Sequence, residues 1–99
     1  MSDSAQIVVV GAGTMGRGIA QVAAMAGHPT VLYDPRPEAL PAARGSIEAN
    51  LKEGVAKGKV LPEVATATLS HLLTSADPNV RRGAVVIEAA VERLDVKRE

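Results

Sequence analysis

The amino-acid sequence predicts an α/β fold in which a small parallel sheet is flanked by helices. Three observations support this prediction. Short apolar runs recur along the 99 residues, apolar residues at helical spacing separate them, and the first run stops at a G-x-G-x-x-G cluster. Strands and helices that alternate at these lengths are typical of βαβ units, whose right-handed crossovers build a parallel sheet. We expect about four strands in the order 3-2-1-4, within one domain.

The first elements follow from apolar patterning and from the residues that end each run. Ile7–Val10 reads as a buried parallel strand. A helix is expected from about Thr14 to Ala26, and Met15 and Met25 on it are expected to fill gaps in the core. The helix should end at Gly27, and Thr30–Tyr33 should form the second strand. The apolar residues at helical spacing are Met15, Ile19, Val22, Ala23 and Ala26.

The remaining elements are predicted from weaker signals. A second helix should begin near residue 38 and bury one apolar stripe. Leu61–Thr66 is expected to form a short helical turn, and Leu69–Thr74 the third strand. Asp77-Pro78 should open a turn or short helix, and Ala84–Ile87 should form the fourth strand. The stripe of the second helix comprises Leu40, Ala43, Ile47, Leu51 and Val55.

Composition argues against several classes of function. The formal net charge is zero, with 11 basic and 11 acidic residues, and the one aromatic residue is Tyr33. Nucleic acid is therefore not an expected partner. The absence of cysteine excludes disulfides, thiolate nucleophiles and Cys-type zinc sites. No signal peptide or membrane-spanning segment is recognisable, so we expect no membrane partner and a cytoplasmic protein.

The glycine cluster predicts a binding site for the pyrophosphate of a dinucleotide. Gly11 would allow the tight turn after the strand, Gly13 would let a phosphate approach the backbone, and Gly16 would let the helix pack closely on the sheet. The helix N-terminus would add unpaired N–H groups and the positive end of its dipole. The alternative is a turn that binds nothing, but the order of strand, glycines, helix, strand and acid favours the dinucleotide.

Asp34 supplies that acid. It ends the second predicted strand, 18 residues beyond Gly16. Its carboxylate would accept hydrogen bonds from an adenosine ribose and repel a 2′-phosphate, which favours NAD over NADP. Arg36 leaves an alternative open, because an arginine at this place can accept a phosphate. It could also lie over the face of the adenine.

Two blocks of the sequence form a much more specific pattern than the glycines alone. The first is GAGTMGRGIAQ, from Gly11 to Gln21. The second is VIEAAVE, from Val86 to Glu92, followed by Leu94, Val96-Lys97 and Glu99. Together they resemble the 3-hydroxyacyl-CoA dehydrogenases, and the resemblance covers nearly the whole chain. It implies the first part of a Rossmann-type NAD-binding domain over residues 1–99, with the family's C-terminal helical domain absent.

The resemblance also implies roles for individual residues. Asp34 would hold the adenosine ribose of NAD. Glu92 and Lys97 match positions near the nicotinamide end, although Lys97 could belong to the charged face of a terminal helix. Asn50 and Lys57 match positions that touch the CoA part of the substrate, and Asn50 stands where the family commonly has serine. The NAD pyrophosphate would lie against Gly11, Ala12, Gly13, Thr14, Met15 and Gly16.

The family oxidises a 3-hydroxyacyl-CoA to the 3-ketoacyl-CoA and transfers a hydride to NAD, with a histidine as base. That histidine lies in a His-Phe-Phe-Asn-Pro segment beyond the matched region, and this chain has no phenylalanine. His28, past a helix, and His71, in the predicted third strand, do not match it. We therefore expect no catalytic residue and no metal ligand within residues 1–99, and no turnover by this segment alone.

Two other functions remain open from the sequence: a stand-alone nucleotide-binding module, and a different Rossmann-type dehydrogenase acting on a small hydroxy acid. The Val86–Glu92 block argues against the second of these. The predicted strand order also leaves the fourth strand at an edge of the sheet with apolar residues exposed. We expect a homo-oligomer, or self-association through that edge.

Overall fold

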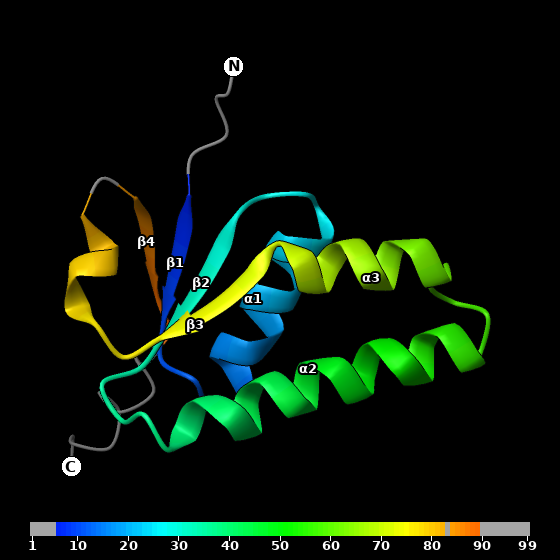
Figure 1. The fold of residues 1–99 in the computed structure, drawn as a ribbon, viewed down its shortest axis with the longest axis horizontal. Coiled ribbons are helices and arrows are strands. Elements are labelled where there is room, and N and C mark those ends of the chain that lie inside the picture. Colours follow the sequence, from blue (N-terminus) through cyan, green and yellow to red (C-terminus); the bar gives the residue numbers. More distant parts are fainter. Residues whose placement is uncertain (1–5, 83, 90–99) are drawn as a thin grey trace, which may run out of the picture.

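The structure, a computed structural model, describes residues 6–82 and 84–89 and confirms the predicted parallel sheet. The strand order is β3-β2-β1-β4, and Val8 of the central strand β1 lies between Val31 of β2 and Val86 of β4. Figure 1 shows α1, α2 and α3 together beside the sheet. The strands are β1 (Ile7–Val10), β2 (Thr30–Tyr33), β3 (Leu72–Ser75) and β4 (Val85–Glu88). The helices are α1 (Thr14–Met25), α2 (Ala39–Ala56), α3 (Pro62–Ser70) and the 3₁₀ helix η1 (Pro78–Arg81).

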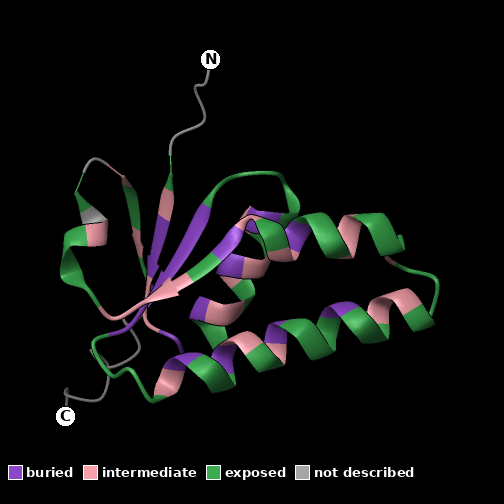
Figure 2. Ribbon diagram, viewed as in Figure 1, coloured by how far each residue is buried: buried purple, intermediate pink, exposed green. Residues whose placement is uncertain are grey.

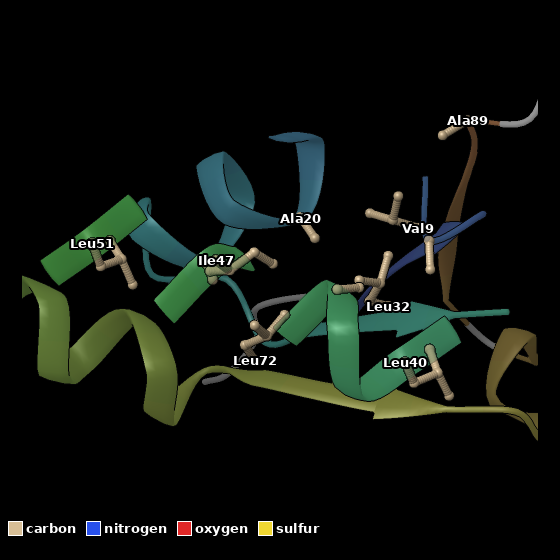
Figure 3. Packing of buried hydrophobic residues seen from close by; sticks show 11 residues of the cluster. Val9, Ala20, Leu32, Leu40, Ile47, Leu51, Leu72 and Ala89 are labelled. Carbon is tan, nitrogen blue, oxygen red and sulfur yellow. The ribbon is translucent and has the colours of Figure 1, made fainter. Parts of the chain in front are cut away.

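The main core lies between these three helices and one face of the sheet. Figure 3 shows Ala20 of α1 and Ile47 of α2 near Leu32 and Leu72 of the strands. The stripe predicted for α2 is confirmed at four of its positions, where Leu40, Ala43, Ile47 and Leu51 are buried. A smaller cluster, formed by Val8, Val31 and Tyr33, packs with Val80 of η1 on the opposite face. Burial is concentrated along β1 and β2, at the start of β3 and on the inner faces of the helices, whereas β4 is largely exposed (Figure 2).

The buried face of α1 differs from the predicted one. Gly16, Ala20 and Ala24 face the sheet, whereas Met15 is 53% exposed and Val22 is 67% exposed. The prediction that Met15 and Met25 fill core gaps is therefore wrong. Small residues occupy the face of α1 that packs on the sheet because they let the helix axis approach the strands closely. The apolar residues predicted for the buried face of α1 instead line an open apolar groove beside the helix, together with Ile7 and Ile87. They are Met15, Ile19, Val22, Ala23 and Ala26.

The boundary between α3 and β3 also differs from the prediction. The segment predicted as a short turn at Leu61–Thr66 continues as a helix to Ser70, and β3 begins at Leu72 rather than Leu69. The hydroxyl of Thr68 donates to the carbonyl of Val64, so this β-branched residue stays within the helix. His71 is the C-cap of α3 rather than a strand residue, and its Nδ1 lies 2.8 Å from the carbonyl oxygen of Ala67.

The other boundaries agree closely with the sequence. The second helix begins at Ala39, and Pro41 fits within its first turn because the N–H groups there have no intrahelical partner. Strand β4 runs from Val85 to Glu88, one residue later than predicted. Among the helices of the described residues, none combines the length and the apolar character needed to cross a membrane.

Candidate nucleotide-binding site

The candidate site begins at the turn between β1 and α1. Gly11 has a φ of +109°, a conformation that strains residues with a side chain, and its N–H donates to the carbonyl of Tyr33 at 2.8 Å. Gly16 lies so close to this turn that an added Cβ would be 1.6 Å from the Gly11 carbonyl oxygen. The first turn of α1 is therefore held directly against the end of β1, as the glycine spacing predicts.

The opening of α1 is suited to an anion. Gly13 is the N-cap, no side chain caps this end, and the first turn contains no acidic residue. A Cβ at Gly13 would meet nothing within 4 Å, so a ligand can approach the backbone there. Unpaired N–H groups and the positive end of the helix dipole face this space. These features fit a pyrophosphate, and they need no positively charged side chain to do so.

Asp34 is tied to the same turn. It directly follows β2 and is 2% exposed. The N–H of Ala12 donates to its Oδ2 at 2.9 Å, across 22 residues of sequence. The turn after β1 and the acid after β2 thus form one unit at the carboxyl ends of adjacent parallel strands, where ligands bind in open α/β sheets.

Arg36 occupies the rest of the Asp34 carboxylate. Its Nε and its backbone N–H both donate to Oδ1 at 2.9 Å, and its Nη2 donates to Oδ2 at 2.9 Å. These hydrogen bonds hold the pKa of Asp34 far below its usual value; burial opposes them, and the Ala12 N–H adds to the lowering. The same pair raises the pKa of Arg36. Asp34 is consequently ionised at neutral pH.

Arg17 is a residue of this region that sequence analysis missed. Its Nη2 donates to Thr14 Oγ1 and its Nη1 donates to Ser46 Oγ, both at 3.1 Å. The guanidinium therefore lies beside the first turn of α1 and joins it to α2. The three-residue spacing of Thr14 and Arg17 on one helix was a usable signal for the first contact. The contact with Ser46 depends on helix packing, which the sequence does not show.

The residues expected to touch CoA lie along α2. The side-chain amide of Asn50 donates to Gln21 Oε1 at 3.4 Å, which places Asn50 against α1. Lys57 is the C-cap of α2, and its Nζ lies 2.9 Å from Glu53 Oε2. Lys57 is thus at the far end of α2 from the glycine turn (Figure 1). Glu92 and Lys97 lie outside the described residues.

Comparison with known proteins identifies the family. Residues 6–99 match the model described as 3-hydroxyacyl-CoA dehydrogenase, NAD binding domain. The chain belongs to this family. It is 46% identical over 93 residues to 3-hydroxyadipyl-CoA dehydrogenase of Escherichia coli K12, a match that covers 93% of this chain and 20% of that relative. It is 41% identical to the mitochondrial hydroxyacyl-coenzyme A dehydrogenase of Rattus norvegicus, covering 94% and 32%.

Solved structures agree with this assignment. The crystal structure of 3-hydroxybutyryl-CoA dehydrogenase from E. coli K12 superposes with a TM-score of 0.86 at 44% identity, over 96% of this chain and 20% of that one. The enzyme of the same name from Ralstonia eutropha superposes with a TM-score of 0.83 at 30% identity, over 96% and 34%. The chain therefore spans about a fifth to a third of the length of these relatives. The resemblance read from the two sequence blocks is confirmed.

Proposed function

We propose that residues 1–99 form part of an NAD-binding domain, in which the turn from Gly11 to Gly16 holds the pyrophosphate and Asp34 holds the adenosine ribose. The hydrogen bond from Ala12 N–H to Asp34 Oδ2 is the observation that carries this proposal. It fixes the phosphate-binding turn and the ribose acceptor in one rigid unit, and ligand-binding groups held before binding lose less entropy when the ligand arrives.

We propose that the whole protein oxidises a 3-hydroxyacyl-CoA to the 3-ketoacyl-CoA. The C3 carbon gives a hydride to NAD⁺, and the C3 hydroxyl gives its proton to a base outside residues 1–99. Within this segment, Asn50 and Lys57 would contact the CoA, and Glu92 and Lys97 would border the nicotinamide end of the cofactor. Family membership and the geometry of the turn support the reaction type, while the relatives are named for different acyl groups.

The assay of this function is NADH formation at 340 nm by the purified full-length protein, with 3-hydroxyacyl-CoA substrates of graded length. We expect turnover with NAD⁺ and none from residues 1–99 alone. Gly13→Ala should weaken NAD binding about tenfold or more by placing a methyl group where the pyrophosphate approaches. Its melting temperature should change little, because no protein atom lies within 4 Å of that methyl group.

The matched control is Gly18→Ala, in the same helix and also with nothing within 4 Å of the added Cβ. It should leave the NAD dissociation constant unchanged. NAD binding without any acyl-CoA oxidation would instead support a nucleotide-binding module. Oxidation of small hydroxy acids in place of acyl-CoA would support the other dehydrogenase class. Equal NAD affinity in the Gly13→Ala variant would contradict the phosphate site.

We also propose self-association through the edge of the sheet at β4. Within the described residues β4 pairs only with β1, and Val85 is 52% exposed on it. Light scattering should show a mass that rises with protein concentration, and Val85→Lys should shift it towards the monomer because a charge blocks edge pairing. A sharp monomer at high concentration would count against this proposal. Separately, we propose a cytoplasmic location, which cell fractionation tests.

A further inference from the structure

We propose that Arg36 determines the nucleotide specificity of this site: an adenosine ribose binds by displacing the Arg36 side chain from Asp34, and the displaced guanidinium accepts a 2′-phosphate. The site then takes NADP as well as NAD, although an acid at the end of β2 favours NAD. The inference rests on the proposed dinucleotide site and assigns it a second ligand, a 2′-phosphorylated dinucleotide.

The acceptor capacity of Asp34 is the first step. An ionised carboxylate offers about four lone-pair sites on its two oxygens. Oδ1 accepts from the backbone N–H and the Nε of Arg36, and Oδ2 accepts from the N–H of Ala12 and the Nη2 of Arg36. The carboxylate is therefore saturated by protein donors. A ribose diol gains its hydrogen bonds to Asp34 only where one of these donors leaves.

The donors that leave are those of the Arg36 side chain. The two backbone N–H groups are fixed by the turn after β1 and by the chain after β2. The Arg36 side chain is 63% exposed, whereas that of Asp34 is 3% exposed. The guanidinium therefore already borders water, which can solvate it when it leaves the carboxylate, whereas Asp34 stays in place. The two hydroxyls of a ribose would then replace the two N–H donors of the guanidinium, donor for donor.

The displaced guanidinium stays close to the ribose. The backbone N–H of Arg36 remains on Asp34, so the side chain pivots from a fixed point beside the proposed ribose acceptor. A guanidinium binds a phosphate through two parallel hydrogen bonds, and an arginine near this acid is the usual partner of a 2′-phosphate. The negative charge of Glu38 interacts with Arg36 and raises its pKa. The same charge would repel a phosphate, which limits the attraction of Arg36 for it. NADP should therefore bind more weakly than NAD, by about tenfold.

The decisive variant is Arg36→Met, which keeps the length of the side chain and removes its charge and donors. Dissociation constants for NADH and NADPH are measured by fluorescence titration of the full-length protein. We expect Arg36→Met to bind NADH about twofold to fivefold more tightly, because the competitor for Asp34 is gone. It should bind NADPH about tenfold more weakly, because the phosphate loses its partner. Lys59→Met, at the far end of α2, removes the same charge and should change neither value.

The outcomes separate this inference from the proposed function. Weaker NADH binding by Arg36→Met would overturn it and would place Arg36 on the adenine instead. Wild-type protein that binds NADH but excludes NADPH would also overturn it, while the NAD site itself would stand. Wild-type protein that binds neither dinucleotide would overturn the proposed function. Thermal melting of Arg36→Met, expected to stay within a few degrees of wild type, shows that the variant is folded.

Discussion

Gly16→Ala is expected to lower the free energy of unfolding by about 1–3 kcal/mol and to weaken NAD binding about tenfold or more. The new Cβ would lie 1.6 Å from the carbonyl oxygen of Gly11 and 2.8 Å from its carbonyl carbon. Both atoms are backbone, so no flexible side chain can move aside. Helix α1 must shift away from the end of β1, and its first-turn N–H groups move with it.

Urea denaturation measures the stability, and fluorescence titration with NADH measures the binding. Gly18→Ala is the control, because it makes the same change two residues along α1, in open space. Alanine is the better helix former, so this control should be about 0.5–1 kcal/mol more stable than wild type. If Gly16→Ala matched Gly18→Ala in stability, the close approach of α1 to β1 would be disproved.

Local sequence signals were sufficient for the centre of the sheet. Ile7–Val10 and Thr30–Tyr33 are strands with the predicted limits, because each is a short apolar run bounded by residues that end it. The limits of α3 and β3 were not readable in this way. Leu69 and Ser70 suit a strand as well as a helix, and they continue α3, in which Thr68 is buried, while the strand begins only at Leu72.

The sequence also did not indicate which face of α1 is buried. Two stripes lie side by side on this helix, one small (Gly16, Ala20 and Ala24) and one larger and more apolar. Apolar periodicity alone selects the larger one. The close contact of Gly16 with Gly11 selects the smaller one, and this contact exists only in three dimensions.

The sequence predicted which residues form the site, but it did not predict which of them are hydrogen-bonded to one another. Glycine spacing located the turn, and the place of Asp34 after a strand identified it as the candidate ribose acceptor. The hydrogen bond between Ala12 and Asp34 follows from the parallel pairing of β1 with β2. The fork of Arg36 on Asp34 and the contact of Arg17 with Ser46 depend on rotamers and helix packing, which no spacing rule encodes.

Asp34→Asn is expected to weaken NAD binding by about 10- to 100-fold, because each hydroxyl of the ribose loses a charged acceptor. The variant should also be about 1–3 kcal/mol less stable at pH 7. Its amide oxygen can still accept from Ala12 N–H, but its NH₂ group then replaces Oδ1 and faces the backbone N–H and the Nε of Arg36, which are both donors. Glu63→Gln, an equivalent change at an exposed position of α3, should alter stability by a few tenths of a kcal/mol and leave NAD binding unchanged.

The pH dependence of this stability difference identifies its origin. The folded protein holds the pKa of Asp34 below its unfolded value of about 3.9, so the stability it contributes is fully present above that pH. This contribution is lost as the pH falls from about 4 towards the folded pKa. The gap between wild type and Asp34→Asn should therefore be constant from pH 5 to 8 and should narrow below about pH 4. A gap that stayed the same at pH 3 would mean that packing around the side chain, rather than the charge held by Arg36 and Ala12, causes the loss.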